Sequence, residues 1–278
     1  MHLTMLNLGM QSEIMCIGKI VSIWDGDRFF MDFSSGLFAF IAFACFLGTF
    51  VQRVSGIGYG IIVMLFFPLV LSMGEATALS GMGSLIASCV VAYTMRKHVN
   101  IKKAMMPMVP YCVIACLMML FVKSAAPRLL MILLGIALCG MSVYCYFFSG
   151  RIHIRPTARN AMIAGSIGGV LSGLFSMGGP PVMVYFISCS DTNDEYLANI
   201  QFFFVVSNAI STVARLANGF VTQRVLWLML PAAAAMVAAN YTGGKVYKRI
   251  SAEGLRKVVY GVVGLCGLLT ILRATVLS

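Results

Sequence analysis

The chain is built from long apolar stretches separated by short polar segments. Stretches of about 20 residues are needed for a helix to cross the hydrocarbon core of a bilayer. A backbone surrounded by lipid must satisfy its own hydrogen bonds, which leaves helices and closed barrels. Barrel strands alternate apolar and polar residues, and these stretches do not, so the pattern predicts an all-α integral membrane protein. The stretches without Asp, Glu, Lys or Arg are 33–52, 54–74, 76–95, 104–122, 129–148, 160–190, 196–214, 225–244 and a shorter 258–272.

Two apolar segments are interrupted by glycine or proline. The first, 33–74, contains the sequence S-G-I-G-Y-G at residues 55–60, and the second, 160–190, contains S-M-G-G-P-P at residues 176–181. The second segment is too long for one straight span and too short for two. Glycine permits backbone angles that break a helix, and proline ends the preceding helix while suiting the first turn of a new one. We therefore predict a helix–break–helix hairpin in each segment.

The two breaks belong to an internal repeat with an offset of about 120 residues. Lys103 and Pro110 recur as Arg224 and Pro231, and further matches keep the same order. The repeat predicts two halves, each a Gly/Pro-broken helix or hairpin followed by three transmembrane helices, or about eight elements. The expected domains are an N-terminal tail at 1–32, with Met31 as an alternative native start, repeat 1 at 33–149, a basic linker at 150–157 and repeat 2 at 158–278.

The basic residues predict the topology. The net charge of +11 is concentrated in short loops between apolar stretches, as expected for the cytoplasmic side of a membrane protein, so nucleic acid is not an expected partner. If each interrupted segment enters and leaves on its own side, the strongly basic loops all share one side. This arrangement makes the halves inverted repeats, and it predicts a multi-pass protein of the cell inner membrane.

Each break is a candidate binding site because a new helix begins there. Unpaired N–H groups and the helix dipole attract anions to a helix N-terminus. Close packing between helices is the alternative role for such glycines, but their equivalent positions in the two halves favour a functional site. The candidate substrate-binding residues at the breaks are Ser55, Gly56, Gly58, Gly60, Ser176, Gly178, Gly179 and Pro180.

Polar residues elsewhere in the spans extend this candidate site. Asn199, Gln201 and Asn208 occupy one apolar stretch, and Arg53 borders the first break, where anion capture and snorkelling to the interface are equal alternatives. A serine every four residues from position 80 to 88 either coordinates an oxyanion or forms a close helix contact. We expect Arg215 to be an interfacial anchor.

Acidic residues are scarce and predict helix ends or loops. We expect Glu75 in a loop rather than as a proton carrier in the membrane, and we expect Asp194 and Glu195 in the first turn of a helix, where the dipole favours negative charge. The sequence contains no plausible catalytic set, no phosphate-binding loop and no metal-ligand spacing. It therefore predicts neither an enzyme nor a resident cofactor or metal.

The residues around the breaks resemble those of the sulfite exporter TauE/SafE family. The resemblance covers residues 33–272 and rests on V-S-G-I-G-Y-G at 54–60 with Pro68, and on G-V-L-S-G-L-F-S-M-G-G-P-P at 169–181. Tyr59 and Ser176 stand where glycine is common in the family. Members are linked to export or uptake of sulfite, sulfoacetate and other organosulfonates, so the resemblance implies a carrier of small anions.

These observations predict a secondary transporter of a small anion, such as sulfite, an organosulfonate or another sulfur-containing anion, that works by alternating access in the lipid bilayer. A proton or sodium ion is expected to drive it, and homo-oligomerisation stays open. The alternative is a membrane scaffold or assembly subunit without a solute path.

Overall fold

The structure is a computed structural model that describes residues 35–55, 58–144, 155–246 and 252–276. All regular elements in these ranges are helices, as the apolar pattern predicts. The predicted tail at 1–32, most of the predicted linker at 150–157 and the candidate residue Gly56 lie outside the described residues.

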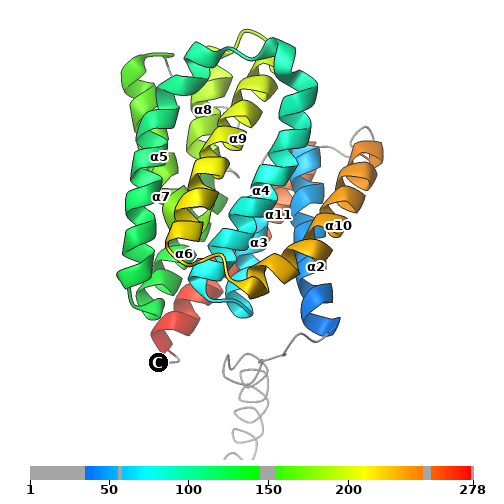
Figure 1. Ribbon diagram of the computed structural model, residues 1–278, viewed down its shortest axis with the longest axis vertical. Helices are drawn as coiled ribbons and strands as arrows, with labels where there is room; N and C mark the ends of the chain where they lie inside the picture. The colour runs from blue at the N-terminus through cyan, green and yellow to red at the C-terminus, as the bar shows by residue number, and fades with distance from the viewer. Residues whose placement is uncertain (1–34, 56–57, 145–154, 247–251, 277–278) are drawn as a thin grey trace, which may run out of the picture.

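Both interrupted segments fold as a long helix followed by a short one. Helix α2 (Ser35–Ser55) precedes α3 (Tyr59–Phe66) and the short 3-10 helix η1 (Phe67–Leu69), and α7 (Ala158–Phe175) precedes α8 (Gly179–Cys189). The helix breaks therefore lie where the glycine and proline pattern predicts them. In Figure 1, α8 lies in the upper half of the molecule and α3 in the lower half.

Three further helices follow each of these pairs. The first set is α4 (Met73–Met95), α5 (Ile101–Ser124) and α6 (Pro127–Val143), with the 3-10 helix η2 (Arg96–His98) between α4 and α5. The second set is α9 (Asn193–Ala217), α10 (Gln223–Val246) and α11 (Ala252–Val276).

Side chains cap the two helices that follow the short ones. Ser72 and Glu75 form a capping box at the start of α4, in which the Ser72 hydroxyl accepts a hydrogen bond from the Glu75 N–H. Thr192 caps α9 in the same way through the N–H of Glu195. Such caps satisfy N–H groups that have no partner inside the helix. Asp194 and Glu195 thus lie in the first turn as expected, whereas Glu75 lies in the first turn of α4 rather than in a loop.

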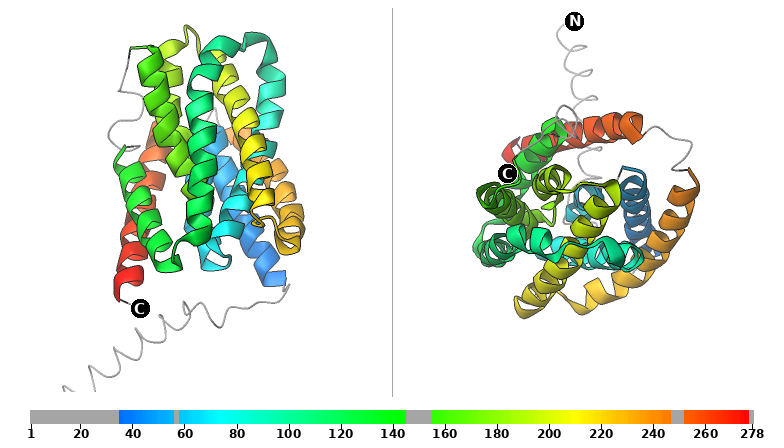
Figure 2. Two further views of the ribbon diagram at one scale, coloured as in Figure 1. Left: turned by 60° about the vertical axis from the view of Figure 1, so that its left-hand side comes forward. Right: turned by 90° about the horizontal axis from the view of Figure 1, so that it is seen from above.

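The helices pack as a bundle in which each long helix has a main partner. Helix α2 packs against α10, α5 against α7, α4 against α9 and α6 against α11, and Figure 2 shows α10 and α11 at the periphery of the bundle. Several contacts are close because one partner is glycine. A side chain on Gly165 of α7 would collide with the carbonyl of Pro107 on α5, and one on Gly267 of α11 would approach the carbonyl of Gly135 on α6. At these glycines the close-packing role applies, as small residues allow in membrane proteins.

The outer surface of the bundle is apolar. Large side chains such as Leu117, Val213, Val237 and Leu269 are more than half exposed. Among the described residues, five helices contain windows that are long and apolar enough to cross a membrane: Gly36–Arg53, Met73–Tyr93, Ile101–Ser124, Asp194–Ala217 and Gln223–Gly243. This surface and these lengths suit a bilayer rather than water.

The two helix hairpins open toward opposite ends of the bundle. In Figure 1, α2 and α4 both begin at the lower end, whereas α7 and α9 both begin at the upper end. The basic segment η2 lies at the upper end, where α5 and α7 also begin. Each hairpin therefore returns to the side from which it starts, which is the arrangement that the distribution of basic residues favours.

Candidate functional site

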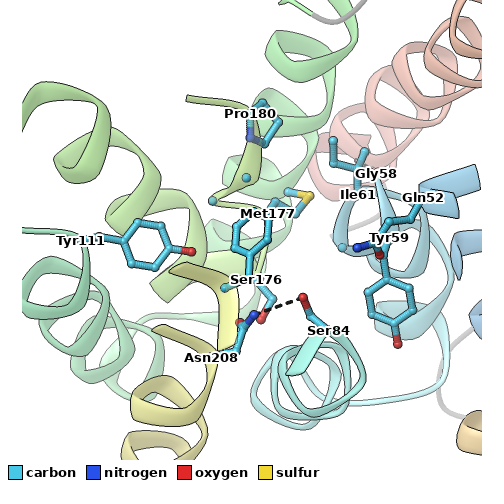
Figure 3. A pocket seen from close by; sticks show the side chains of 14 residues that line it. Gln52, Gly58, Tyr59, Ile61, Ser84, Tyr111, Ser176, Met177, Pro180 and Asn208 are labelled. Carbon is cyan, nitrogen blue, oxygen red and sulfur yellow. Dashed lines mark hydrogen bonds between the residues drawn. The ribbon is translucent and has the colours of Figure 1, made fainter. Parts of the chain in front are cut away.

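A small cavity lies where the two helix breaks meet. It encloses about 50 Å³, which is room for a few water molecules or one small ion, since a water needs roughly 10–15 Å³ of such space. Six helices (α2, α3, α4, α5, α8 and α9) and both breaks contribute to its wall, part of which Figure 3 shows. The lining residues are Gln52, Gly58, Tyr59, Gly60, Ile61, Ser84, Tyr111, Ser176, Met177, Gly178, Gly179, Pro180, Phe204 and Asn208.

The first break presents the N-terminus of α3 to this cavity. Gly58 is the N-cap and has φ 122° and ψ −8°, a conformation that L side chains rarely adopt. The first intrahelical bond runs from the Ile62 N–H to the Gly58 carbonyl, at 3.0 Å. The N–H groups of Tyr59, Gly60 and Ile61 come before it and have no partner inside the helix. The cavity therefore faces three backbone donors at the positive end of a helix dipole.

The second break is a helix C-terminus followed at once by a new N-terminus. Ser176 takes the left-handed conformation, with φ 56°, and Met177 N–H donates to the Leu171 carbonyl at 3.2 Å. This bonding ends α7 as a Schellman motif does. Helix α8 then starts at Gly179, with Pro180 and Pro181 in its first turn. Proline has no N–H group, so the glycines supply the donors at this helix start.

The two breaks are in direct contact. A side chain on Gly60 would collide with the carbonyl oxygen of Ser176, so glycine is required for this approach. The Ser176 hydroxyl donates to the carbonyl of Thr77 on α4, at 3.0 Å, and fixes the second break to the bundle. The starts of α3 and α8 are therefore held around one shared space.

A polar pair closes another part of the wall. The Asn208 amide on α9 donates to the Ser84 hydroxyl on α4 at 3.2 Å, as Figure 3 shows. The neighbouring serines of the stripe, Ser80 and Ser88, are fully buried, and their hydroxyls have no partner among the described residues. Ser84 is thus the residue of the serine stripe that lines the cavity, and Asn208 is the one of the three predicted polar residues on α9 that does so.

Four predicted site residues lie elsewhere or are only partly described. The Asn199 side chain accepts a hydrogen bond from the Asn100 N–H at 2.7 Å and so joins the start of α5 to α9. Gln201 is buried away from the cavity lining, and Arg53 is exposed at the end of α2, beside Gly243 of α10. Ser55 ends α2, and its side chain lies outside the described part of the structure.

Several lining residues were not among the sequence candidates. Gln52, Tyr111 and Phe204 come from helix positions whose local sequence carries no functional signal. Tyr59 stands where the family often has glycine, and Figure 3 shows that its ring points away from the centre of the cavity. Its hydroxyl lies 3.6 Å from the sulfur of Cys45 on α2. Tyr59 thus gives the site its backbone N–H group, while its side chain packs between helices.

Arg215 is not the interfacial anchor that its position at the end of a span suggests. Only 1% of its surface is exposed, and its Nη2 donates to the carbonyl of Ser172 on α7 at 2.9 Å. The prediction is wrong because the Arg215 side chain points into the bundle and binds α7 there, although α9 itself ends only two residues later, at Ala217. None of the cavity-lining residues themselves carries a charge.

The geometry places the N-termini of α3 and α8 at one small cavity. Backbone N–H groups and helix dipoles suit an anion, and unwound backbone at membrane depth is tolerated where protein covers it. Within the described residues, no group of three His, Cys, Asp or Glu side chains could hold a metal ion. Such a site is typical of solute carriers that bind their substrate between broken helices.

Comparison with known proteins supports this class. The profile of the family described as Sulfite exporter TauE/SafE matches residues 40–270, and the chain belongs to this family. The chain is 24% identical over 223 residues to the probable sulfite/organosulfonate exporter TauE of Cupriavidus necator, covering 78% of this chain and 86% of that protein. No solved structure matches. The protein is therefore a multi-pass transporter of the inner membrane and not an enzyme.

Proposed function

We propose that this protein is a secondary transporter of a small sulfur-containing anion, sulfite or an organosulfonate, which binds in the cavity between the starts of α3 and α8. The observation that carries the proposal is the convergence of two helix N-termini on one small cavity. The relative in Cupriavidus necator, a probable sulfite/organosulfonate exporter, supports the choice of substrate.

We propose that the two halves, 33–149 and 158–278, are inverted repeats in which helices of one half pack against helices of the other. Helix α2 of the first half packs on α10 of the second, and α7 of the second half packs on α5 of the first. The capping pair Ser72 and Glu75 has its counterpart in Thr192 and Glu195, 120 residues later in each case. Pseudo-symmetry of this kind places one binding site at the interface between repeats.

One polar contact between the halves lies at each end of the bundle. Glu195 accepts a hydrogen bond from Lys103 at 2.8 Å, and Lys103 also reaches Asp191 at 3.3 Å. Glu75 accepts one from the Thr222 hydroxyl at 2.9 Å. Glu75 in the first turn of α4 thus contacts a residue at the start of α10, and Glu195 in the first turn of α9 contacts a residue at the start of α5. We propose that alternating access breaks one of these contacts while the other stays closed, with a proton or sodium ion as the driving ion.

The proposal is tested by ligand binding and flux with one matched pair of variants. The purified full-length protein is titrated with sulfite, sulfoacetate, taurine, sulfate and chloride in a thermal-shift assay, because a ligand of the folded state raises its stability with concentration. We expect saturable stabilisation by sulfite or an organosulfonate. The same anion should then cross the membrane of proteoliposomes that contain the protein.

A methyl group at Gly179 should reduce this binding. A Cβ there would lie 3.3 Å from Phe204, a side chain that also lines the cavity, and it meets no backbone atom. Gly179→Ala should therefore fold while losing about tenfold or more in anion affinity, since a site this small has no room to spare. Gly140→Ala is the control, because nothing lies within 4 Å of its Cβ position. If the wild type binds none of these anions and carries no flux, the proposed function is wrong.

A further inference from the structure

Arg215 carries a buried positive charge that the described protein leaves without a counter-charge. Its side chain is 1% exposed, and only Nη2 is hydrogen-bonded, whereas Nε and Nη1 have no partner among the described residues. The ion pairs within the described ranges both involve Lys103. A guanidinium stays protonated in proteins, and an unpaired charge inside a membrane protein is costly. Such a charge is a candidate for function.

The guanidinium lies directly behind the second helix break. A Cβ built on Gly81 of α4 would lie 2.8 Å from Nη1 of Arg215 and 3.5 Å from the hydroxyl oxygen of Ser176. The free Nη1 group and Ser176 therefore approach the same point on α4. Ser176 lines the cavity and Arg215 does not, so the charge lies one side chain behind the cavity wall.

Capping of α7 explains only part of this arrangement. A cation is favourable at the carbonyl end of a helix, and Nη2 of Arg215 does bind the Ser172 carbonyl there. Arg128 caps α11 with the same chemistry, donating to the carbonyls of Ala274 at 3.0 Å and Thr275 at 3.4 Å, yet it is exposed to solvent. A cap therefore requires neither complete burial nor two unused donor atoms next to a cavity.

We propose that Arg215 is the charge-balancing residue of the anion site, a fixed positive charge behind Ser176 that holds anions in the cavity and favours dianions over monoanions. This inference rests on the proposed function. The interaction of a fixed charge with a bound ion scales with the charge of the ion. At separations of several ångströms and an effective dielectric constant of about 20, it amounts to about tenfold or more in affinity for each unit of ion charge.

The test compares two anions of different charge across three variants of the full-length protein. Sulfite serves as the dianion and methanesulfonate as the monoanion. The dissociation constant of each is measured in detergent at a mildly alkaline pH, at which bisulfite has lost its proton. Arg215→Gln should weaken sulfite binding about a hundredfold or more and methanesulfonate binding about tenfold, since the first ion carries two charges and the second carries one. Arg215→Lys keeps the charge and should retain most of the preference for the dianion. Arg128→Gln removes a helix cap far from the cavity and should change neither constant.

The outcomes separate this inference from the proposed function. If the wild type binds neither anion, the proposed function is wrong and this inference with it. If Arg215→Gln binds both anions as the wild type does, or loses both by the same factor, then Arg215 has only a structural role. The inference is then overturned while the proposed function stands.

A second variant covers the case in which Arg215→Gln does not fold. Gly81→Ala places a methyl group 2.8 Å from Nη1, the flexible far end of the arginine side chain, which can move aside. We expect the variant to fold and to lose about threefold or more in sulfite affinity because the charge is displaced. Gly140→Ala is its control. Unchanged sulfite affinity in Gly81→Ala would also overturn the inference.

Discussion

At the scale of single residues, Gly58 and Gly219 share an unusual backbone but not a location. Both have positive φ, 122° and 77°, but Gly58 lies at the cavity whereas Gly219 lies between α9 and α10 with open space around it. An alanine in the left-handed region costs about 1–2 kcal/mol, and φ 122° at Gly58 lies outside that region. We expect Gly58→Ala to lower the unfolding temperature at least as much as Gly219→Ala does.

Only Gly58→Ala should impair transport. The substitution shifts the start of α3, so the N–H groups of Tyr59 and Gly60 no longer point at the cavity. Flux of sulfite into proteoliposomes, corrected for the amount of folded protein, measures the difference. Equal flux in Gly58→Ala and Gly219→Ala would mean that the start of α3 does not bind the solute.

Asn208 offers a test of the sign of the bound charge. Asn208→Asp replaces an amide on the cavity wall by a carboxyl of the same shape, which ionises as the pH rises. Its charge repels an anion, so we expect anion affinity to fall by about tenfold or more at high pH and by less at low pH. Titration of the purified variant at several pH values measures this dependence.

The control for this substitution lies on the same helix. Asn218 is the C-cap of α9, and its side chain donates to the Ala214 carbonyl at 2.8 Å, away from the cavity. Asn218→Asp should leave anion affinity unchanged at every pH. Tighter binding in Asn208→Asp would instead indicate a cationic solute.

The polar residues show where sequence reasoning at this scale ends. Asn199, Gln201 and Asn208 look alike in the sequence, because each is a polar residue in one apolar stretch. The structure brings Asn208 to the cavity, while Asn199 joins two helices. Which face of α9 meets which neighbour decides between these roles, and a single helix does not carry that information.

At the scale of elements, α5 and α7 depend on a small residue at their contact. Gly165 of α7 lies against the carbonyl of Pro107 on α5, where a side chain would meet fixed backbone. Gly165→Val must therefore push the helices apart, and we expect it to cost about 1–3 kcal/mol or to prevent folding. The unfolding temperature and the yield of monodisperse protein in detergent measure this loss.

Gly261 provides the comparison for α11. Its Cβ position has nothing within 4 Å, so Gly261→Val should change the unfolding temperature little. If Gly165→Val and Gly261→Val lower the unfolding temperature equally, valine destabilises these helices through its low helix propensity rather than by pushing α5 and α7 apart.

The breaks themselves could be predicted as elements because their causes are local. Glycine at a positive φ and proline in a first helical turn act within a few residues, so the ends of α2 and α7 and the starts of α3 and α8 follow from the sequence. The burial of Arg215 could not be predicted in this way. Its position at the end of an apolar stretch also suits an interfacial anchor, and only the tertiary contact of its side chain with the Ser172 carbonyl on α7 excludes that role.

At the scale of the whole molecule, the basic loops predict which end faces the cytoplasm. The end that carries η2 holds Arg96 and Lys97 and lies with the start of α7, so it should be cytoplasmic. In spheroplasts, whose periplasmic face is open to the medium, a short protease site inserted after Lys97 should be protected from added protease, whereas one inserted after Gly219 should be cut. Cleavage after Lys97 alone would reverse the predicted orientation.

The sequence by itself determined that the protein lies in a membrane, that it is helical and where its two breaks lie, and it predicted an approximate repeat. Each of these depends on residues that are neighbours in the chain, through hydropathy, proline and glycine geometry, or the spacing of similar motifs. Only the tertiary structure decided that the breaks meet in one cavity, that Ser84 and Tyr111 line it, and that Arg215 is buried behind it. Those facts depend on contacts between helices that are far apart in the chain. Such contacts are decided by how every helix is rotated and positioned in the bundle.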